Sequence, residues 1–239
     1  MKIAMPRPSS IVFAIACALT TILPSTSFAQ DMLSASLNTV RITDPKKGWG
    51  HGVRIDANHI LTAAHVVDES AEGTQFTLLD TSARDAGLAM VEKIGHRKLV
   101  DLALLRITKD DFNTEVSAPL KVCKDNVKPG TPLFVFYENR GQHTHASADQ
   151  PQWHLGVESA TMTEAFFSHG VSGAAVFDVE KNCLAGIVSQ QRLTNSDTAE
   201  QCLTDTVNKK PLLKACSLLI GTVFVPALDI GTFLGQEQF

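Results

Sequence analysis

Apolar residues along this chain come in short runs that are rich in valine, isoleucine and phenylalanine and are separated by glycine, asparagine, aspartate and proline. Runs of this length between turn-forming residues are typical of β-strands. Long amphipathic helical patterns are missing, and we expect one short helix from Pro226 to Leu234, after a proline start. The predicted strands are residues 37–42, 50–55, 58–62, 74–79, 87–94, 101–107, 131–137, 152–162, 174–178, 183–189 and 220–225.

Strands this numerous and this closely spaced indicate an all-β fold built from closed or nearly closed antiparallel barrels, because closure removes exposed strand edges. Pro119, Pro129 and Gly130 interrupt the strand pattern. We therefore expect a first barrel at about 36–118 and a second at about 130–226. A pocket is expected in the cleft between them.

The N-terminal residues resemble an export signal. Lys2 and Arg7 precede an apolar run from Ile11 to Leu23, and Pro24 ends that run shortly before Ala29. This pattern predicts a signal peptide over residues 1–29 and a mature domain over 30–239. The apolar run holds roughly a dozen residues, too few to span about 30 Å of hydrocarbon. We expect a periplasmic or secreted protein without membrane insertion after signal cleavage.

Charge and cysteine content narrow the possible functions. The formal net charge is −4 and the aromatic content 6%, with scattered basic residues, which argues against nucleic-acid binding. Cys17 lies in the predicted leader, where a lipid anchor is the less favoured alternative. An even number of cysteines in an exported domain favours disulfides over zinc or thiol chemistry. Of the three possible pairings we favour Cys123–Cys183 and Cys202–Cys216.

Three motifs carry complementary chemistry: T-A-A-H-V-V around His65, D-L-A-L-L around Asp101 and H-G-V-S-G around Ser172. A serine hydroxyl needs a base to take its proton, and histidine titrates near neutral pH. An aspartate can orient that histidine and stabilise its charged form. Each residue alone has a structural explanation, but the three contexts together predict a Ser-His-Asp catalytic triad. Their order differs from that of α/β-hydrolases, and Ala174 stands where a G-x-S-x-G motif requires glycine.

These segments resemble the chymotrypsin-like, or trypsin-like, serine protease superfamily, and are most similar to the bacterial Deg/HtrA-type protease domain. The resemblance covers about Gly48 to Pro226. It implies two six-stranded antiparallel barrels and a serine endopeptidase that hydrolyses protein or peptide substrates through an acyl-enzyme, without a cofactor. We expect no PDZ domain, because the chain ends soon after the matched region. The matching segments are L-T-A-A-H at 61–65, D-L-A-L-L-R-I at 101–107, G-V-S-G-A-A-V at 170–176, G-I-V-S at 186–189 and G-T-V-F-V-P at 221–226.

The resemblance also implies an oxyanion hole made by the backbone N–H groups of Gly170 and Ser172. Glycine at this position is also compatible with a simple tight turn. Val171 departs from the family, in which aspartate or asparagine often precedes the serine. Activation by a new N-terminal amine is therefore not expected, and the oxyanion loop either forms from the outset or becomes ordered on substrate binding.

Specificity is inferred from the resemblance alone. Phe166, six residues before Ser172, occupies the position where trypsin-type specificity requires an acid, so we expect cleavage after small or medium apolar residues. The alternative is that Phe166 points into the core. The expected substrate-binding residues are Phe166, His169, Ser189, Gln190, Gln191 and Gly221.

Two further interpretations of the sequence are less favoured. His143, His145 and His154 are close in sequence, but their polar surroundings favour a solvated loop, and no metal site is expected. The alternative function is a catalytically silent, protease-like binding protein. The sequence leaves the natural substrate and the oligomeric state open.

Overall fold

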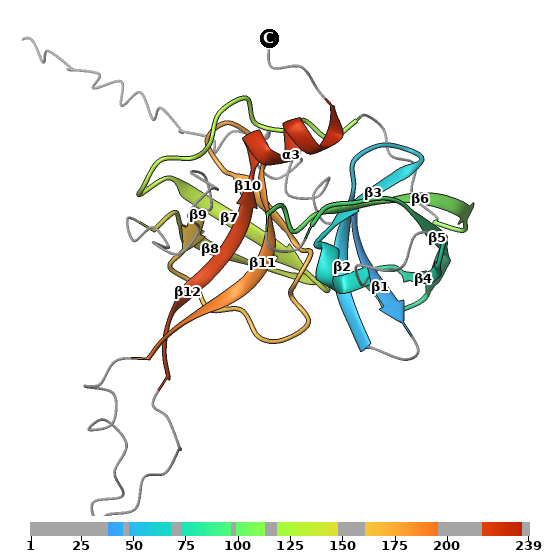
Figure 1. Ribbon diagram of the computed structural model, residues 1–239, viewed down its shortest axis with the longest axis horizontal. Helices are drawn as coiled ribbons and strands as arrows, with labels where there is room; N and C mark the ends of the chain where they lie inside the picture. Colours follow the sequence, from blue (N-terminus) through green and yellow to red (C-terminus); the bar gives the residue numbers. More distant parts are fainter. Residues whose placement is uncertain are drawn as a thin grey trace, which may run out of the picture.

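The structure is a computed structural model that describes residues 38–44, 48–67, 73–96, 99–112, 119–147, 161–195 and 217–235. Two β-units lie side by side, with a helix packed across them (Figure 1). The predicted fold class, all-β with two six-stranded antiparallel barrels and a short C-terminal helix, is confirmed, the second barrel being a curled sheet rather than a fully closed one. The fold is chymotrypsin-like.

The first unit is a closed barrel with the strand order β1-β2-β3-β6-β5-β4. Its interior is filled by branched and aromatic side chains, including Val40, Ile42, Phe76 and Leu105. A single helical turn, α2 (Ala64–Val67), follows the third strand. The strands are β1 (Thr39–Asp44), β2 (Gly48–Arg54), β3 (His59–Thr62), β4 (Gln75–Leu79), β5 (Asp85–Ile94) and β6 (Ala103–Asp110).

The second unit is a curled six-stranded sheet with the order β8-β7-β10-β11-β12-β9. A bridge between Ala146, just after β8, and Thr163 in β9 connects its two edges. The sheet therefore curls toward closure. The strands are β7 (Pro132–Tyr137), β8 (Arg140–His145), β9 (Thr161–Thr163), β10 (Ala175–Asp178), β11 (Cys183–Asn195) and β12 (Ser217–Pro226).

A third apolar cluster joins the two units. It contains Leu61 and Leu102 from the first unit and Phe177 and Ile187 from the second. Helix α3 (Ala227–Leu234) adds two further side chains, Ile230 and Phe233. Because burying apolar surface is the main favourable term in folding, this shared core fixes the relative position of the loops at the junction.

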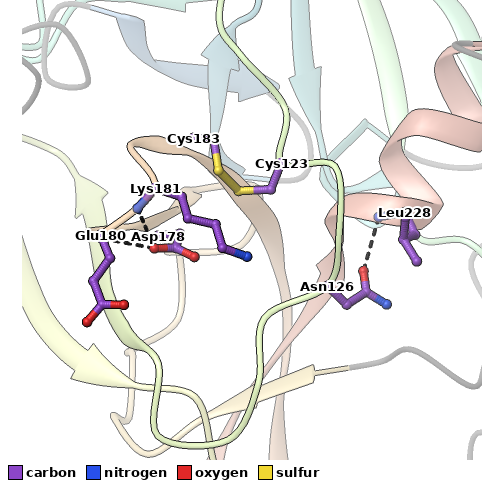
Figure 2. The surroundings of a disulfide bond; sticks show 7 residues. All are labelled: Cys123, Asn126, Asp178, Glu180, Lys181, Cys183 and Leu228. Atoms are coloured by element: carbon purple, nitrogen blue, oxygen red, sulfur yellow. Dashed lines mark hydrogen bonds between the residues drawn. A yellow bond between two sulfur atoms is a disulfide. The ribbon is translucent and has the colours of Figure 1, made fainter. Parts of the chain in front are cut away.

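A disulfide joins the segment between the two units to the start of β11. Cys123 and Cys183 are bonded with their Cα atoms 5.1 Å apart (Figure 2). Nearby, the Asn126 side chain accepts a hydrogen bond from the N–H of Leu228 at the start of α3 (3.1 Å). The connecting segment is thus held against both β11 and the C-terminal helix. The second predicted disulfide, Cys202–Cys216, lies outside the described residues.

Strand boundaries differ from the prediction mainly in the second unit. Residues 140–145, expected as a solvated loop, form β8 and pair with β7. Strands β11 and β12 extend beyond the predicted 183–189 and 220–225. Of the predicted strand at 152–162, only its end falls in the described region, at the start of β9.

The predicted leader, residues 1–29, lies outside the described residues. Within the part of the chain that is described, no helix is both long and apolar enough to cross a membrane.

Candidate active site

His65 is presented at the junction of the two units by the turn of α2. The preceding residues, from Ile60 to Ala64, are fully buried and anchor the turn. The His65 side chain keeps 20% of its surface exposed. A rigid strand end and a short helix therefore hold an accessible imidazole.

Asp101 precedes β6 and receives several hydrogen bonds. Its Oδ2 atom lies 2.7 Å from His65 Nδ1, and its Oδ1 accepts the backbone N–H of His65 at 3.0 Å. The Ser189 hydroxyl donates to the same Oδ2 at 2.5 Å. Burial acts to raise the pKa of Asp101, but the hydrogen bonds and charge of His65 and the Ser189 hydroxyl outweigh it, so this pKa lies below its ordinary value. The carboxylate is therefore ionised at neutral pH.

Ser172 lies in the tight loop before β10. Gly173 has φ +84, and a Cβ there would lie 1.9 Å from the carbonyl oxygen of His51, so the loop requires glycine. The carbonyl of Ser172 accepts the N–H of His51 at 2.8 Å. The Ser172 hydroxyl donates to the Ser189 carbonyl at 3.4 Å, and the hydrogen bonds of the described residues include none between this hydroxyl and His65.

His65 and Ser172 line one pocket of about 370 Å³. Its apolar walls come from Phe167, Val171 and Val188. Polar groups are contributed by Ser168, His169, Ser189, Gln190 and Thr222. Among the described residues that line it, none is acidic or carries a permanent positive charge.

Three predicted substrate-binding residues, His169, Ser189 and Gln190, line this pocket. Phe166 is not among the residues that line it and is 47% exposed. A bend after β9 turns the next residue, Phe167, inward against Tyr137, with ring centroids 5.6 Å apart. The alternative that Phe166 points into the core is wrong.

Gly221 also stands outside the pocket lining. It pairs with Arg192 across the hairpin, and a Cβ there would meet the Thr163 carbonyl oxygen at 2.3 Å. Its neighbour Thr222 faces the pocket instead and accepts the N–H of Phe167 at 3.3 Å. The Gln191 side chain lies outside the described part of the structure.

Gly170 adopts φ +94 beneath the Trp49 indole, where a Cβ would lie 2.4 Å from the ring. Its carbonyl oxygen is 2.7 Å from Nδ1 of His51. His51 is not predicted from the sequence, because a single polar residue in a strand carries no functional signature. Its distinguishing feature there is its position between two glycines, Gly50 and Gly52.

Metal ligation finds no support among the described side chains, which contain no group of three or more His, Cys, Asp or Glu residues suited to an ion. His143 and His145 lie on the solvent-facing side of β8, with Thr144 turned inward between them. His154 lies outside the described residues.

Comparisons with known proteins identify the family of the chain and support its fold. The family described as "trypsin-like peptidase domain" matches residues 50–187. The Rv3671c protease of M. tuberculosis H37Rv, solved in an inactive form, is similar in structure, with a TM-score of 0.56 and 15% identity over 87% of this chain and 92% of that one. The HtrA-type protease AlgW, solved with a tripeptide, has a TM-score of 0.59 and 18% identity over 88% of this chain and 64% of that one. No curated protein matches the sequence.

Proposed function

The chain belongs to the trypsin-like peptidase family and is a serine endopeptidase that resembles HtrA-type proteases, and on that premise we propose that His65, Asp101 and Ser172 are its catalytic triad. The observation that carries this proposal is the paired hydrogen bonding of Asp101 to both the ring and the backbone of His65, beside a pocket that Ser172 shares. This arrangement leaves Nε2 of His65 as the ring nitrogen that can serve Ser172.

The reaction follows from these positions. Nε2 of His65 takes the proton from Ser172 Oγ as the oxygen attacks the substrate carbonyl carbon. The ionised Asp101 accepts the Nδ1–H bond and stabilises the imidazolium. His65 then returns the proton to the leaving amine, the C–N bond breaks, and an acyl-enzyme forms. Water attacks the ester by the same proton transfers and releases Ser172.

The attacking geometry requires the Ser172 hydroxyl to change its hydrogen-bond partner. The Ser172 hydroxyl donates to the Ser189 carbonyl at the weak distance of 3.4 Å. Rotation of its side chain toward His65 exchanges that bond for a stronger one, and catalytic hydrogen bonds commonly tighten only when substrate is bound.

The oxyanion formed during attack would be bound by the N–H groups of Gly170 and Ser172. Within the described residues neither N–H donates to another backbone group. Each such donor contributes about 2.7–4 kcal/mol to the stabilisation of the transition state.

Cleavage after small or medium apolar residues is supported by the composition of the pocket. Phe167, Val171 and Val188 offer apolar contact, and no carboxylate among the described lining residues is available to attract lysine or arginine. Phe167, rather than Phe166, is the phenylalanine that lines the pocket. Substrates would be unfolded proteins or peptides, whose backbone can enter the cleft.

Export to the periplasm or beyond is supported by the leader sequence. The Cys123–Cys183 disulfide agrees with an oxidising compartment.

The test is casein digestion by the purified mature protein, with Ser172→Ala as the matched variant and a fluorophosphonate as inhibitor. The proposal expects digestion by the wild type, its loss on fluorophosphonate treatment and no digestion by the variant. Equal digestion by the wild type and Ser172→Ala would overturn the assignment of the nucleophile.

A further inference from the structure

His51 is fully buried, and both of its ring nitrogens are hydrogen bonded. Nδ1 lies 2.7 Å from the carbonyl oxygen of Gly170, and Nε2 lies 2.9 Å from the backbone N–H of Glu138. A carbonyl can only accept and an amide N–H can only donate. The two partners therefore fix one tautomer: a neutral ring with its hydrogen on Nδ1.

The backbone of His51 holds the other end of the same loop. Its N–H donates to the Ser172 carbonyl at 2.8 Å, and its own carbonyl accepts the Thr62 hydroxyl at 2.6 Å. One residue thus binds the carbonyl groups on both sides of Val171. The rings of Trp49 and Tyr137 pack edge-on against the imidazole, with centroids 5.5 and 6.4 Å away, and fix its orientation.

We propose that His51 is a positioning residue that holds Gly170 in the conformation required for oxyanion binding, an inference that rests on the proposed function. Gly170 sits at φ +94 and, as a glycine, has other backbone conformations open to it. Rotation about its backbone would turn its N–H away from the substrate. The bond from His51 to the Gly170 carbonyl anchors the peptide plane that follows Gly170, which leaves the backbone less freedom to turn the Gly170 N–H away.

The charged groups near His51 have opposing effects on its pKa. Arg41 on β1 and Glu138 in the β7–β8 turn act on the ring with opposite signs. Asp80 lines a second pocket together with His51, Arg41 and Glu138, but it is paired with Arg84. Burial is the largest influence and lowers the pKa of His51, partly offset by the Gly170 carbonyl. A second ring proton would also point Nε2–H at the N–H of Glu138 and break that bond.

Two substitutions test the roles of the two ring nitrogens of His51 separately. His51→Asn keeps an amide donor near the Nδ1 position and gives up the acceptor for Glu138. His51→Gln places its amide near the Nε2 position, where it can accept from Glu138, and gives up the donor to Gly170. The two variants are of similar polarity, so a purely structural role would not favour Asn over Gln.

The experiment measures kcat and KM of the wild type and both variants on a peptide p-nitroanilide with alanine before the scissile bond, with folding checked by thermal unfolding. We expect His51→Gln to lower kcat by about 10- to 100-fold with little change in KM, less than the 10²–10³-fold cost of losing an oxyanion donor outright. His51→Asn should stay within about threefold of the wild type, the cost of one modest hydrogen bond. If the wild type is active and the two variants have equal kcat, the inference is wrong. If the wild type cleaves neither this peptide nor casein, the proposed function fails first and the inference fails with it.

A measurement on the unmodified protein keeps the inference testable if a variant does not fold. In ¹⁵N-histidine-labelled wild type, the ring of His51, assigned through contacts with the Trp49 and Tyr137 rings, should show a protonated Nδ1 and a bare Nε2 at pH 7.5. The opposite tautomer, or a charged ring, would overturn the inference.

Discussion

The carboxylate of Asp101 is hydrogen bonded to His65 at two points, the ring Nδ1 at 2.7 Å and the backbone N–H at 3.0 Å. The pair of contacts fixes both the position of the ring and its tautomer, because an ionised carboxylate can only accept. The hydroxyl of Ser189 donates a further hydrogen bond to Oδ2 of Asp101. Ser189, which also lines the pocket, thereby holds the carboxylate in place.

Asp101→Asn should abolish most activity while leaving the fold in place. An amide at this position can donate to the His65 ring and favour the wrong tautomer, with Nδ1 bare. We expect kcat to fall about 10⁴-fold, as in other Ser-His-Asp enzymes. Steady-state kinetics on the p-nitroanilide substrate measure the loss, and a kcat within tenfold of the wild type would argue against Asp101 as the acid.

Phe167→Val should widen the pocket and shift the preference for the residue before the scissile bond toward larger apolar side chains. Phe167 is 2% exposed and lines the pocket, so a smaller side chain there should leave more room. The shift is measured as the ratio of kcat/KM for phenylalanine and alanine p-nitroanilides. Phe166→Val is the matched control, because that side chain is exposed and stands outside the pocket; the account is wrong if the control moves the ratio and Phe167→Val does not.

Removal of the Cys123–Cys183 disulfide should destabilise the protein without changing the site. The bond spans 60 residues, and constraining such a loop in the unfolded chain contributes about 4 kcal/mol in the entropy model. We expect the Cys123→Ala, Cys183→Ala double variant to lose about 2–4 kcal/mol in the free energy of unfolding, measured by urea denaturation. An unchanged midpoint under oxidising conditions would contradict this.

Stability should depend on pH through His51. Its pKa in the folded protein lies below the ordinary value of 6.5, so on acidification the unfolded chain binds a proton before the folded one does. The free energy of unfolding therefore falls as the pH drops below about 6.5, until the lowered pKa is reached, and is constant for this group below that point. Urea denaturation between pH 5 and 8 measures the slope, which should be shallower in His51→Asn. An identical slope in the variant would exclude His51 as the source.

The sequence alone predicts the parts of this molecule that depend on local pattern. Short β-branched runs mark most strands, and the motifs around His65, Asp101 and Ser172 mark the site. Strand β8 escapes such a prediction because it is an edge strand in which only Thr144 is buried. Its polar residues leave no hydrophobic alternation to detect.

The pocket depends on details that spacing does not carry. Residues 166 and 167 are both phenylalanine, and only the bend after Thr163 decides which one faces inward. The contact between His51 and Gly170 joins residues 119 positions apart. No local sequence pattern predicts this contact, because it forms only when the two β-units pack together.

The most direct test of the central claim is to identify the residue that a fluorophosphonate modifies. Peptide mapping by mass spectrometry of the labelled, folded wild type should find one adduct, on Ser172, and none after His65→Ala or Ser172→Ala substitution. An adduct on another residue, or no adduct on folded and proteolytically active protein, would contradict the account.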